Sequence, residues 1–511
     1  MKSLLKQCSP YFLIGIVLTV LFYSTGYNRN WSFWADQELT LGYNGLLINS
    51  GLNQEYIDHP GFFSIHLIAL LLKVGSFLGL SDINNIMQFN QAPSMFDAMR
   101  YLVISARHAA LLTTFALISG IYYVSKQIFK SAGIALLVAF LAFVSNGVFY
   151  HFTATRTEPI AFLFLMLALY YFVASYQNSS FKKYLLLQLC LICFFCAALN
   201  KAQVIVLAPF YFCWATYFIP KANLTEKTVS NNLIYSLLAA LSYAILLYFY
   251  FIQSTGISFL FNVALVSFFN LLIAGIALKI QRKDAFLASA IFNACYLLAF
   301  LVVELMSTQI NLGISIFGNI ADPMRMLGFL KADPSQIMHP ENHFSASASI
   351  LERVSSLLGF AASPLIETFG RISSSTLLFA FIVMTLIYQC KSIAKKEWWF
   401  GCFSLASFYV VSLVNKFRYL DAPQYRIFSE FFLFTFALLL IYKMPQRLQK
   451  RTLGILIFLT LLANLVPYTH YYNWLIRKGS HPFCQSGLIP VHQRMDAKRI
   501  DLECIQPSAE H

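Results

Sequence analysis

Charged side chains are scarce in this sequence. Only 11% of its 511 residues are Asp, Glu, Lys or Arg, while 58% are hydrophobic. Soluble domains carry about 25% charged residues, so this chain has too little polar surface to cover a water-soluble body. The composition therefore predicts an all-α polytopic membrane protein, and it excludes intrinsically disordered and collagen-like chains.

Acidic residues are the scarcer charge, with 22 Asp and Glu against 36 Lys and Arg, which gives a formal net charge of +14. In a soluble domain such an excess would suggest a nucleic-acid partner, but the hydrophobicity of this chain excludes that class. The basic excess is instead expected to serve the membrane or an anionic ligand.

The sequence also lacks internal repeats, Gly/Ser-rich linkers and low-complexity tracts. We therefore expect one membrane domain over residues 1–468 and a short outer tail over 469–511. Cys484 and Cys504 lie in this polar tail, where an oxidising compartment would join them. Such a disulfide would stabilise the tail by about 3 kcal/mol in the chain-entropy model.

Long apolar runs predict about thirteen transmembrane helices, because one crossing needs about 20 apolar residues. Lys2 and Lys6 precede the first run, which we interpret as a retained span, with a signal peptide as the alternative. The runs lie near residues 11–26, 101–124, 131–150, 159–177, 184–199, 203–219, 232–251, 258–279, 285–304, 374–390, 398–415, 427–442 and 452–468.

Short loops rich in Lys and Arg alternate with the other loops, and the positive-inside rule places them in the cytoplasm. The first outer loop is then 27–61, and a long outer loop covers 305–373. A bacterial inner membrane is favoured over the endoplasmic reticulum. Part of the reason is that the N-glycosylation sequons Asn178-Ser-Ser and Asn223-Leu-Thr fall on the predicted cytoplasmic side, where no glycosylation would occur. A third sequon, Asn30-Trp-Ser, lies on the predicted outer side and argues against this preference.

The alternation holds only if segment 62–80 does not cross the membrane. His59, His66 and Lys73 recur every seven residues and would form one polar stripe on a helix. This favours an amphipathic or partly inserted helix at the outer face. The alternative is a true span whose polar stripe faces other helices.

Several acids fall at the predicted outer boundary of the membrane. Asp36 and Glu38 follow the first span, Asp58 precedes His59-Pro60, and Glu158 precedes Pro159 at the start of a later span. Each is also explained by ordinary helix capping, since Asp36 can cap a helix over 37–49 that ends at Gly51.

Cations fall at the same boundary. Lys201 stands between two short spans, Arg107 lies near the start of a span, and Arg418-Tyr419 and Arg426 lie near the end of the chain. Flanking charges usually only anchor helices. Their common face nevertheless predicts a site for an anionic amphiphile.

The order of these motifs resembles the GT-C superfamily of glycosyltransferases, most closely the enzymes that use polyprenyl-phosphate sugars, such as lipid A aminoarabinose transferase and protein O-mannosyltransferases. The likeness covers roughly the first 205 residues and, less fully, 415–430. It departs from the family's pattern at Pro60-Gly61, where Pro-Pro is common, and at Glu158, where Asp is usual.

The resemblance implies an inverting sugar transfer on the periplasmic face, to a lipid, glycan or protein acceptor. Asp36 would be the base and Glu158 a second catalytic acid, while Glu38 and Asp58 would position acceptor or sugar. The phosphate of the polyprenyl donor would be held by cations and a neighbouring tyrosine: His59, Lys201, Arg418, Tyr419, Arg426 and Arg107.

A metal is possible but not favoured, and no cofactor is firmly expected. His339, Glu341 and His343 in the long outer loop could bind zinc, although an ordered site needs a defined geometry and usually a fourth ligand. A loop that covers the active site is the preferred interpretation of 305–373.

Two other functions use similar residues. A transporter or flippase of a lipid-linked or anionic substrate would place its binding residues near the middle of the bilayer, often in repeated halves. A polysaccharide polymerase or ligase would depend more on outer Arg and His than on a first-loop acid. The residues leave the donor sugar and the acceptor open.

Overall fold

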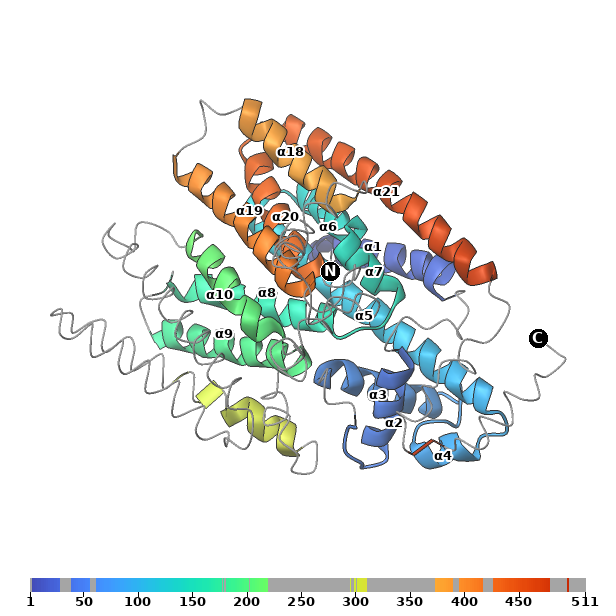
Figure 1. Cartoon of the computed structure of the whole chain (residues 1–511). Helices are drawn as coiled ribbons and strands as arrows, with labels where there is room; N and C mark the ends of the chain where they lie inside the picture. Colours follow the sequence, from blue (N-terminus) through green and yellow to red (C-terminus); the bar gives the residue numbers. More distant parts are fainter. Residues whose placement is uncertain are drawn as a thin grey trace, which may run out of the picture.

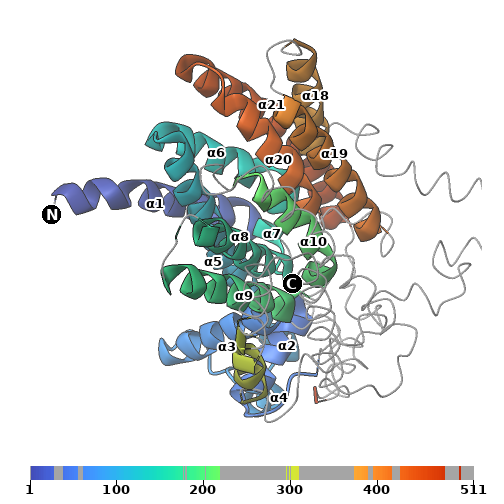
Figure 2. The same cartoon turned by 90° about the vertical axis from the view of Figure 1, so that its left-hand side faces the viewer.

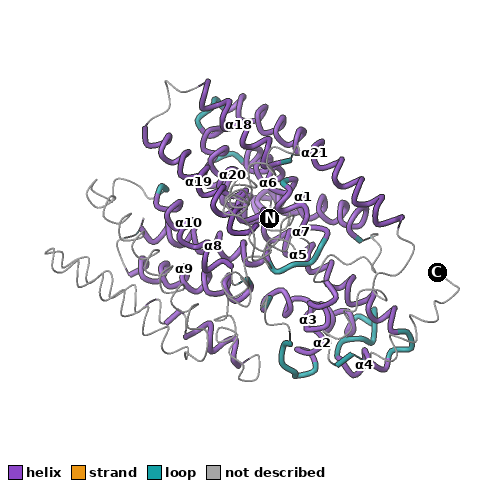
Figure 3. The backbone as a smooth tube through the Cα atoms, in the orientation of Figure 1, coloured by secondary structure: helices purple, strands orange, loops and turns teal. Residues whose placement is uncertain are grey.

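The computed structural model describes residues 2–27, 38–55, 61–176, 178, 181–201, 203–218, 295, 298–299, 301–309, 373–388, 395–416, 426–477 and 494–495. Within these ranges the regular elements are helices, and no strand occurs (Figure 3). The expected all-helical fold class is therefore confirmed for the described part of the chain.

Three helices in these ranges are long and apolar enough to cross a membrane: Met95–Phe129, Glu158–Ser175 and Lys182–Asn200. This is fewer than the thirteen spans expected. One expected span, 131–150, is divided at Ser145 into α6 (Ala132–Val144) and α7 (Asn146–Thr153), each too short to cross alone. The expected spans 232–251 and 258–279 lie outside the described residues.

Most helices form one bundle (Figures 1 and 2). Its members are α1 (Lys2–Leu21) with the π-helical turn Phe22–Gly26, α5 (Met95–Phe129), α6, α7, α8 (Glu158–Tyr176), α9 (Phe181–Asn200), α10 (Gln203–Thr216), α18 (Ser374–Tyr388), α19 (Lys395–Lys416), α20 (Arg426–Tyr442) and α21 (Gln446–Arg477). Helices α8, α18 and α20 begin at the same end of the bundle, which we call the carboxylate end. Phe162 of α8 packs there against Phe428 of α20, with ring centroids 6.0 Å apart.

The opposite end is the lysine end, where α5 and α20 finish and α19 begins. The rings of Phe129 and Tyr442 lie 5.5 Å apart there, and Lys443 forms an ion pair with Glu397. Lys126 and Lys130 lie in the final turn and at the C-cap of α5. Three lysines therefore mark this end of the bundle.

Aromatic side chains fill much of the bundle interior between α10 and α20. Tyr211 contacts Phe432 with centroids 4.9 Å apart, and its hydroxyl donates a hydrogen bond to the carbonyl oxygen of Phe428. Trp214 packs edge-on against Phe431 at 4.7 Å. Offset and edge-on aromatic pairs of this kind add to the stabilisation from apolar burial.

A smaller group of helices packs beside the first half of α5 (Figure 1). It comprises α2 (Glu38–Asn49), α3 (Phe62–Phe77) and α4 (Ile86–Gln91), and we call it the α2–α4 unit. Its own apolar core includes residues of α2, α3 and α5, distinct from the core of the bundle. Helix α3 has 16 residues, whereas a helix needs about 20 residues to cross a membrane.

The polar stripe expected on α3 is divided in the structure. Lys73 is exposed, whereas His66 is half-buried with its Nδ1 2.7 Å from the carbonyl oxygen of Phe62. His59 lies outside the described residues. The apolar side of α3 packs Ile65, Ile68 and Leu72 into the core of the α2–α4 unit.

Candidate functional site

Glu38 and Arg107 form a fully buried ion pair between α2 and α5. The Nε and Nη2 atoms of Arg107 both lie 3.3 Å from Oε2 of Glu38, and neither side chain is exposed. The other carboxylate oxygen of Glu38 accepts a 3.3 Å hydrogen bond from the backbone N–H of Thr155. Glu38 therefore links α2, α5 and the segment that leads into α8.

Glu158 is the centre of a second buried charge cluster at the start of α8. Lys201 places its Nζ 2.7 Å from Oε1 of Glu158, and Arg156 places its Nε 3.2 Å from Oε2. All three side chains are buried. Burying ions away from water costs several kcal/mol per ion, so this arrangement depends on the pairing within the cluster.

Residues 154–157 connect the two charge clusters. They join the end of α7 to the first residue of α8, and Pro159 occupies the second helical position, where its missing N–H costs nothing. Thr155 contacts Glu38 while Arg156, the next residue, contacts Glu158. Any shift of this short segment would disturb both carboxylates.

Asn200, the last residue of α9, fixes the position of Lys201. Its side-chain oxygen accepts from the N–H of Ser64 at 3.2 Å, and its amide nitrogen donates to the carbonyl oxygen of Thr157. Its backbone carbonyl accepts from the N–H of Gly61 at 3.1 Å. Gly61 has a φ of 54°, a left-handed conformation that glycine adopts at little cost. One buried amide thus joins α9 to the start of α3 and to the segment before α8.

A third buried carboxylate, Glu430, lies one turn into α20. It accepts from the backbone N–H of Gly147 at 3.1 Å and from the hydroxyls of Ser374 and Ser375. These donors stand at the starts of α7 and α18, where helix dipoles favour negative charge. Gly147 permits this packing, because a Cβ atom there would lie 2.6 Å from the backbone nitrogen of Ile427.

A polar contact ties the C-terminal part of the chain to the α2–α4 unit. Arg494 places its Nε 3.2 Å from Oε1 of Glu55, and its backbone carbonyl accepts from Asn90 at 2.8 Å. The hydroxyl of Tyr43 donates to Oε2 of Glu55 at 2.6 Å. Burial, followed by this hydrogen bond, raises the pKa of Tyr43, so the hydroxyl remains a donor well into the alkaline range.

The structure brings together four of the side chains predicted from the sequence: Glu38 pairs with Arg107, and Glu158 with Lys201. Arg107 was expected to bind a lipid phosphate, and its guanidinium here contacts a carboxylate. Arg426 begins α20 and is half-buried. The other predicted site residues lie outside the described residues: Asp36, Asp58, His59, Arg418, Tyr419, His339, Glu341, His343, Cys484 and Cys504.

Three buried polar residues at this end of the bundle were absent from the predicted site: Arg156, Asn200 and Glu430. Arg156 is two residues before Glu158, so the sequence shows that the two side chains are close, but it does not show that they form an ion pair. Glu430 is an isolated acid inside an apolar run, and a charge buried among apolar residues is itself a signal of function or of a specific partner. Asn200 has no comparable signal.

Within the described residues no group of three His, Cys, Asp or Glu side chains is placed to hold a metal ion. Comparison with protein families, curated proteins and solved structures finds no match for this chain. The two linked charge clusters are therefore the basis on which a function can be argued.

Proposed function

We propose that this protein is an integral membrane glycosyltransferase that moves a sugar from a polyprenyl-phosphate donor to an acceptor at the carboxylate end of the bundle. The observation that carries the proposal is the convergence of Glu38 and Glu158 with Arg107, Arg156 and Lys201. Ionisable groups buried in a membrane protein are costly and usually mark a substrate site or an ion pathway.

The chemistry of the transfer matches the residue types gathered here. A polyprenyl-phosphate sugar already carries its leaving group, so the reaction requires a base for the acceptor and fixed cations for the departing phosphate. Asp36, two residues before Glu38, is the proposed base.

Lys201 and Arg156 are proposed to face the phosphate. Both are held by Glu158, which orients them in the absence of substrate. A preorganised cation requires little rearrangement when negative charge develops on the leaving group. Glu158 then acts by positioning these cations as well as the acceptor or sugar.

The charge distribution supports the orientation of the proposed site. Lys126, Lys130 and Lys443 lie at the opposite end of the bundle, which the positive-inside rule assigns to the cytoplasm. The carboxylate end would then face the periplasm of a bacterial inner membrane. We also propose that helices beyond the three long apolar ones cross the bilayer, because α20 packs against α8, and α18, α19 and α21 pack against α20.

The direct test is sugar transfer by the purified protein in lipid nanodiscs from a panel of radiolabelled polyprenyl-phosphate sugars, with and without chelator. Transfer by the native chain that is lost in Asp36→Asn and strongly reduced in Glu158→Gln would support the proposal. Asp82→Asn is the matched control, since Asp82 is an exposed acid of the α2–α4 unit. Donor binding with no transfer would overturn the proposal and favour a transporter.

A further inference from the structure

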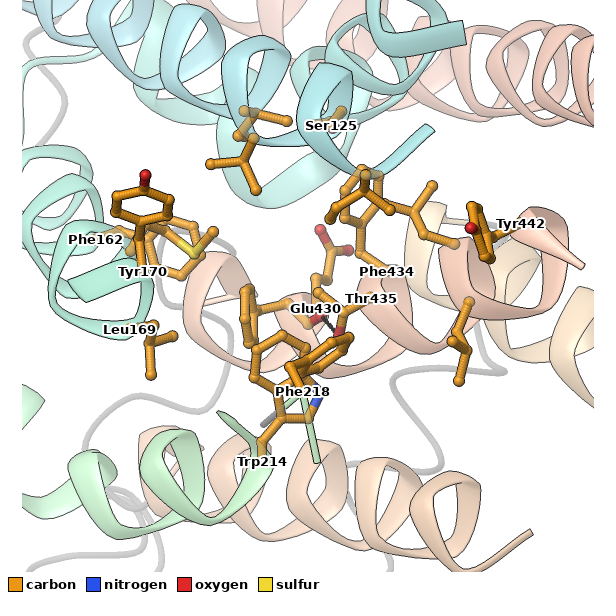
Figure 4. A pocket seen from close by; sticks show the side chains of 18 of the residues that line it. Ser125, Phe162, Leu169, Tyr170, Trp214, Phe218, Glu430, Phe434, Thr435 and Tyr442 are labelled. Atoms are coloured by element: carbon orange, nitrogen blue, oxygen red, sulfur yellow. Dashed lines mark hydrogen bonds between the residues drawn. The ribbon is translucent and has the colours of Figure 1, made fainter. Parts of the chain in front are cut away.

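A cavity of 520 Å³ runs inside the bundle between α5, α8, α10 and α20 (Figure 4). Along α20 its lining extends from Ile427 to Tyr442, which corresponds to about 22 Å of helix. Aliphatic and aromatic side chains form most of this lining, among them Phe162, Leu169, Trp214 and Phe431.

One end of this cavity is closed and lies near the carboxylate end of the bundle. Val148, Phe162 and Ile427 line it there and are each at least nine-tenths buried. Glu430 also lies there, held by donors from α7 and α18. An anionic headgroup would be repelled by this carboxylate, so only an uncharged part of a ligand fits the closed end.

The other end is the more open one. Ile128, Tyr170 and Tyr442 line the cavity toward the lysine end and are 47%, 43% and 49% exposed. Among the described residues, the mouth therefore lies at the end of the bundle away from Glu158 and Lys201. This separates the cavity from the proposed site of sugar transfer.

The surroundings of the mouth are positively charged. Lys126 and Lys130 lie one turn apart at the end of α5, and Lys126 places its Nζ 6.0 Å from the ring centroid of Tyr122. Arg447 and Lys450 lie in the first turns of α21 on the same side. Basic residues beside an opening between membrane helices attract anionic lipid headgroups.

An apolar space of this size requires an apolar occupant. Protein interiors are packed with few voids larger than a water molecule, and buried water needs several polar partners. The volume lies in the range of sites for one small ligand, about 300–1,000 Å³. It therefore suits a single hydrocarbon chain rather than a whole lipid.

We propose that this cavity binds one acyl chain of an anionic phospholipid from the leaflet at the lysine end, with its headgroup on Lys126 and Lys130. The chain extends from the mouth toward Glu430, and the phosphate remains outside at the lysines. This inference does not depend on the glycosyltransferase proposal, because it concerns a different part of the bundle.

The test uses the full chain in nanodiscs and phosphatidylglycerol with a photoreactive diazirine near the end of one acyl chain. Illumination should label peptides of α8, α10 or α20 that line the cavity. Two parallel arms use phosphatidylcholine with the same acyl chain and a polyprenyl phosphate with a diazirine on its chain. Labelling by phosphatidylglycerol should exceed both, and stronger labelling by polyprenyl phosphate would overturn the proposal.

Two pairs of variants separate the chain site from the headgroup site. Leu169→Trp fills the cavity and should abolish labelling, while Leu167→Trp, two residues away and facing outward, should retain it. Lys126→Gln with Lys130→Gln should lower labelling about tenfold. Lys182→Gln, on a helix that does not line the cavity, should leave it unchanged.

Leu438→Trp at the mouth is a second blocking variant, used if Leu169→Trp elutes as an aggregate in size-exclusion chromatography. Equal labelling of the blocked and native proteins would overturn the proposal. Equal labelling by phosphatidylglycerol and phosphatidylcholine would show that the lysines do not select an anionic headgroup, and it would also overturn the proposal.

Discussion

The Nζ atom of Lys201 lies 2.7 Å from Oε1 of Glu158, and both side chains are fully buried. Arg156 contacts the same carboxylate from the other side. Removing one member of such a cluster leaves the others charged and without compensation, whereas removing a pair together costs less. The stability of this end of the bundle is therefore tied to Glu158.

We expect Glu158→Gln to destabilise the purified protein by about 3–5 kcal/mol, because Arg156 and Lys201 remain buried. The double variant Glu158→Gln with Lys201→Met should recover part of this loss. Thermal and denaturant unfolding in detergent measure both. Glu397→Gln, which breaks the partly exposed pair with Lys443, should cost at most about 1 kcal/mol. Similar losses for Glu158→Gln and Glu397→Gln would contradict the prediction.

Asn200→Ala should lower stability by about 1–3 kcal/mol for each buried group that loses its partner. The group left without this partner is the backbone N–H of Ser64, while the carbonyl oxygen of Thr157 keeps a 3.3 Å hydrogen bond from the N–H of Ala161. Asn178→Ala serves as the control, since among the described residues the Asn178 side chain bonds only to the carbonyl oxygen of Ala174, one turn earlier. The prediction fails if the two alanine variants unfold at the same temperature.

Gly147→Ala should destabilise the bundle by about 1–3 kcal/mol, the usual cost of overpacking. The added methyl group would lie 2.6 Å from the backbone nitrogen of Ile427, and a backbone atom cannot turn aside as a side chain can. Gly454→Ala in α21 meets no atom within 4 Å and should instead stabilise by about 0.4–1 kcal/mol. Opposite shifts in unfolding temperature are expected, and shifts of the same sign would refute this packing.

The contact between Arg494 and Glu55 predicts that the C-terminal part of the chain lies on the same side of the membrane as the α2–α4 unit. In a cysteine-free background, Arg494→Cys and Asp82→Cys should react with a membrane-impermeant maleimide from one side. Lys130→Cys should react from the other side. Labelling of Arg494→Cys and Asp82→Cys from opposite sides would show that the contact is absent in cells.

Local features of the fold could be predicted from the sequence. Asp36 and Gly51 delimit a predicted helix over 37–49, and α2 covers Glu38–Asn49. Gly51 follows it with a φ of 67°, as expected for a glycine that ends a helix. The acid–proline pair Glu158-Pro159 was predicted to open a helix, and α8 begins at Glu158. Such signals are contained within a few consecutive residues.

Pairing between distant residues could not be predicted in the same way. Glu38 and Arg107 are 69 positions apart, and the sequence shows that both face the same membrane boundary but not that they touch. Within the described residues fewer helices are long and apolar enough to cross a membrane than the apolar runs predicted, because apolar content does not show where a helix is interrupted. Ser145 divides one expected span, since its hydroxyl bonds the carbonyl oxygen of Ala142 at the point where α6 ends.

Helix α5 has 35 residues and is therefore about 52 Å long, whereas the hydrocarbon core of a bilayer is about 30 Å thick. Its second half packs in the bundle core and its first half in the core of the α2–α4 unit. The helix is continuous, so in the proposed orientation about 20 Å of it extends beyond the hydrocarbon on the side of the α2–α4 unit. A change in bilayer thickness that tilts α5 is therefore expected to displace the α2–α4 unit and to strain the hydrogen bond from Thr155 to Glu38, because Arg107 holds Glu38 to α5.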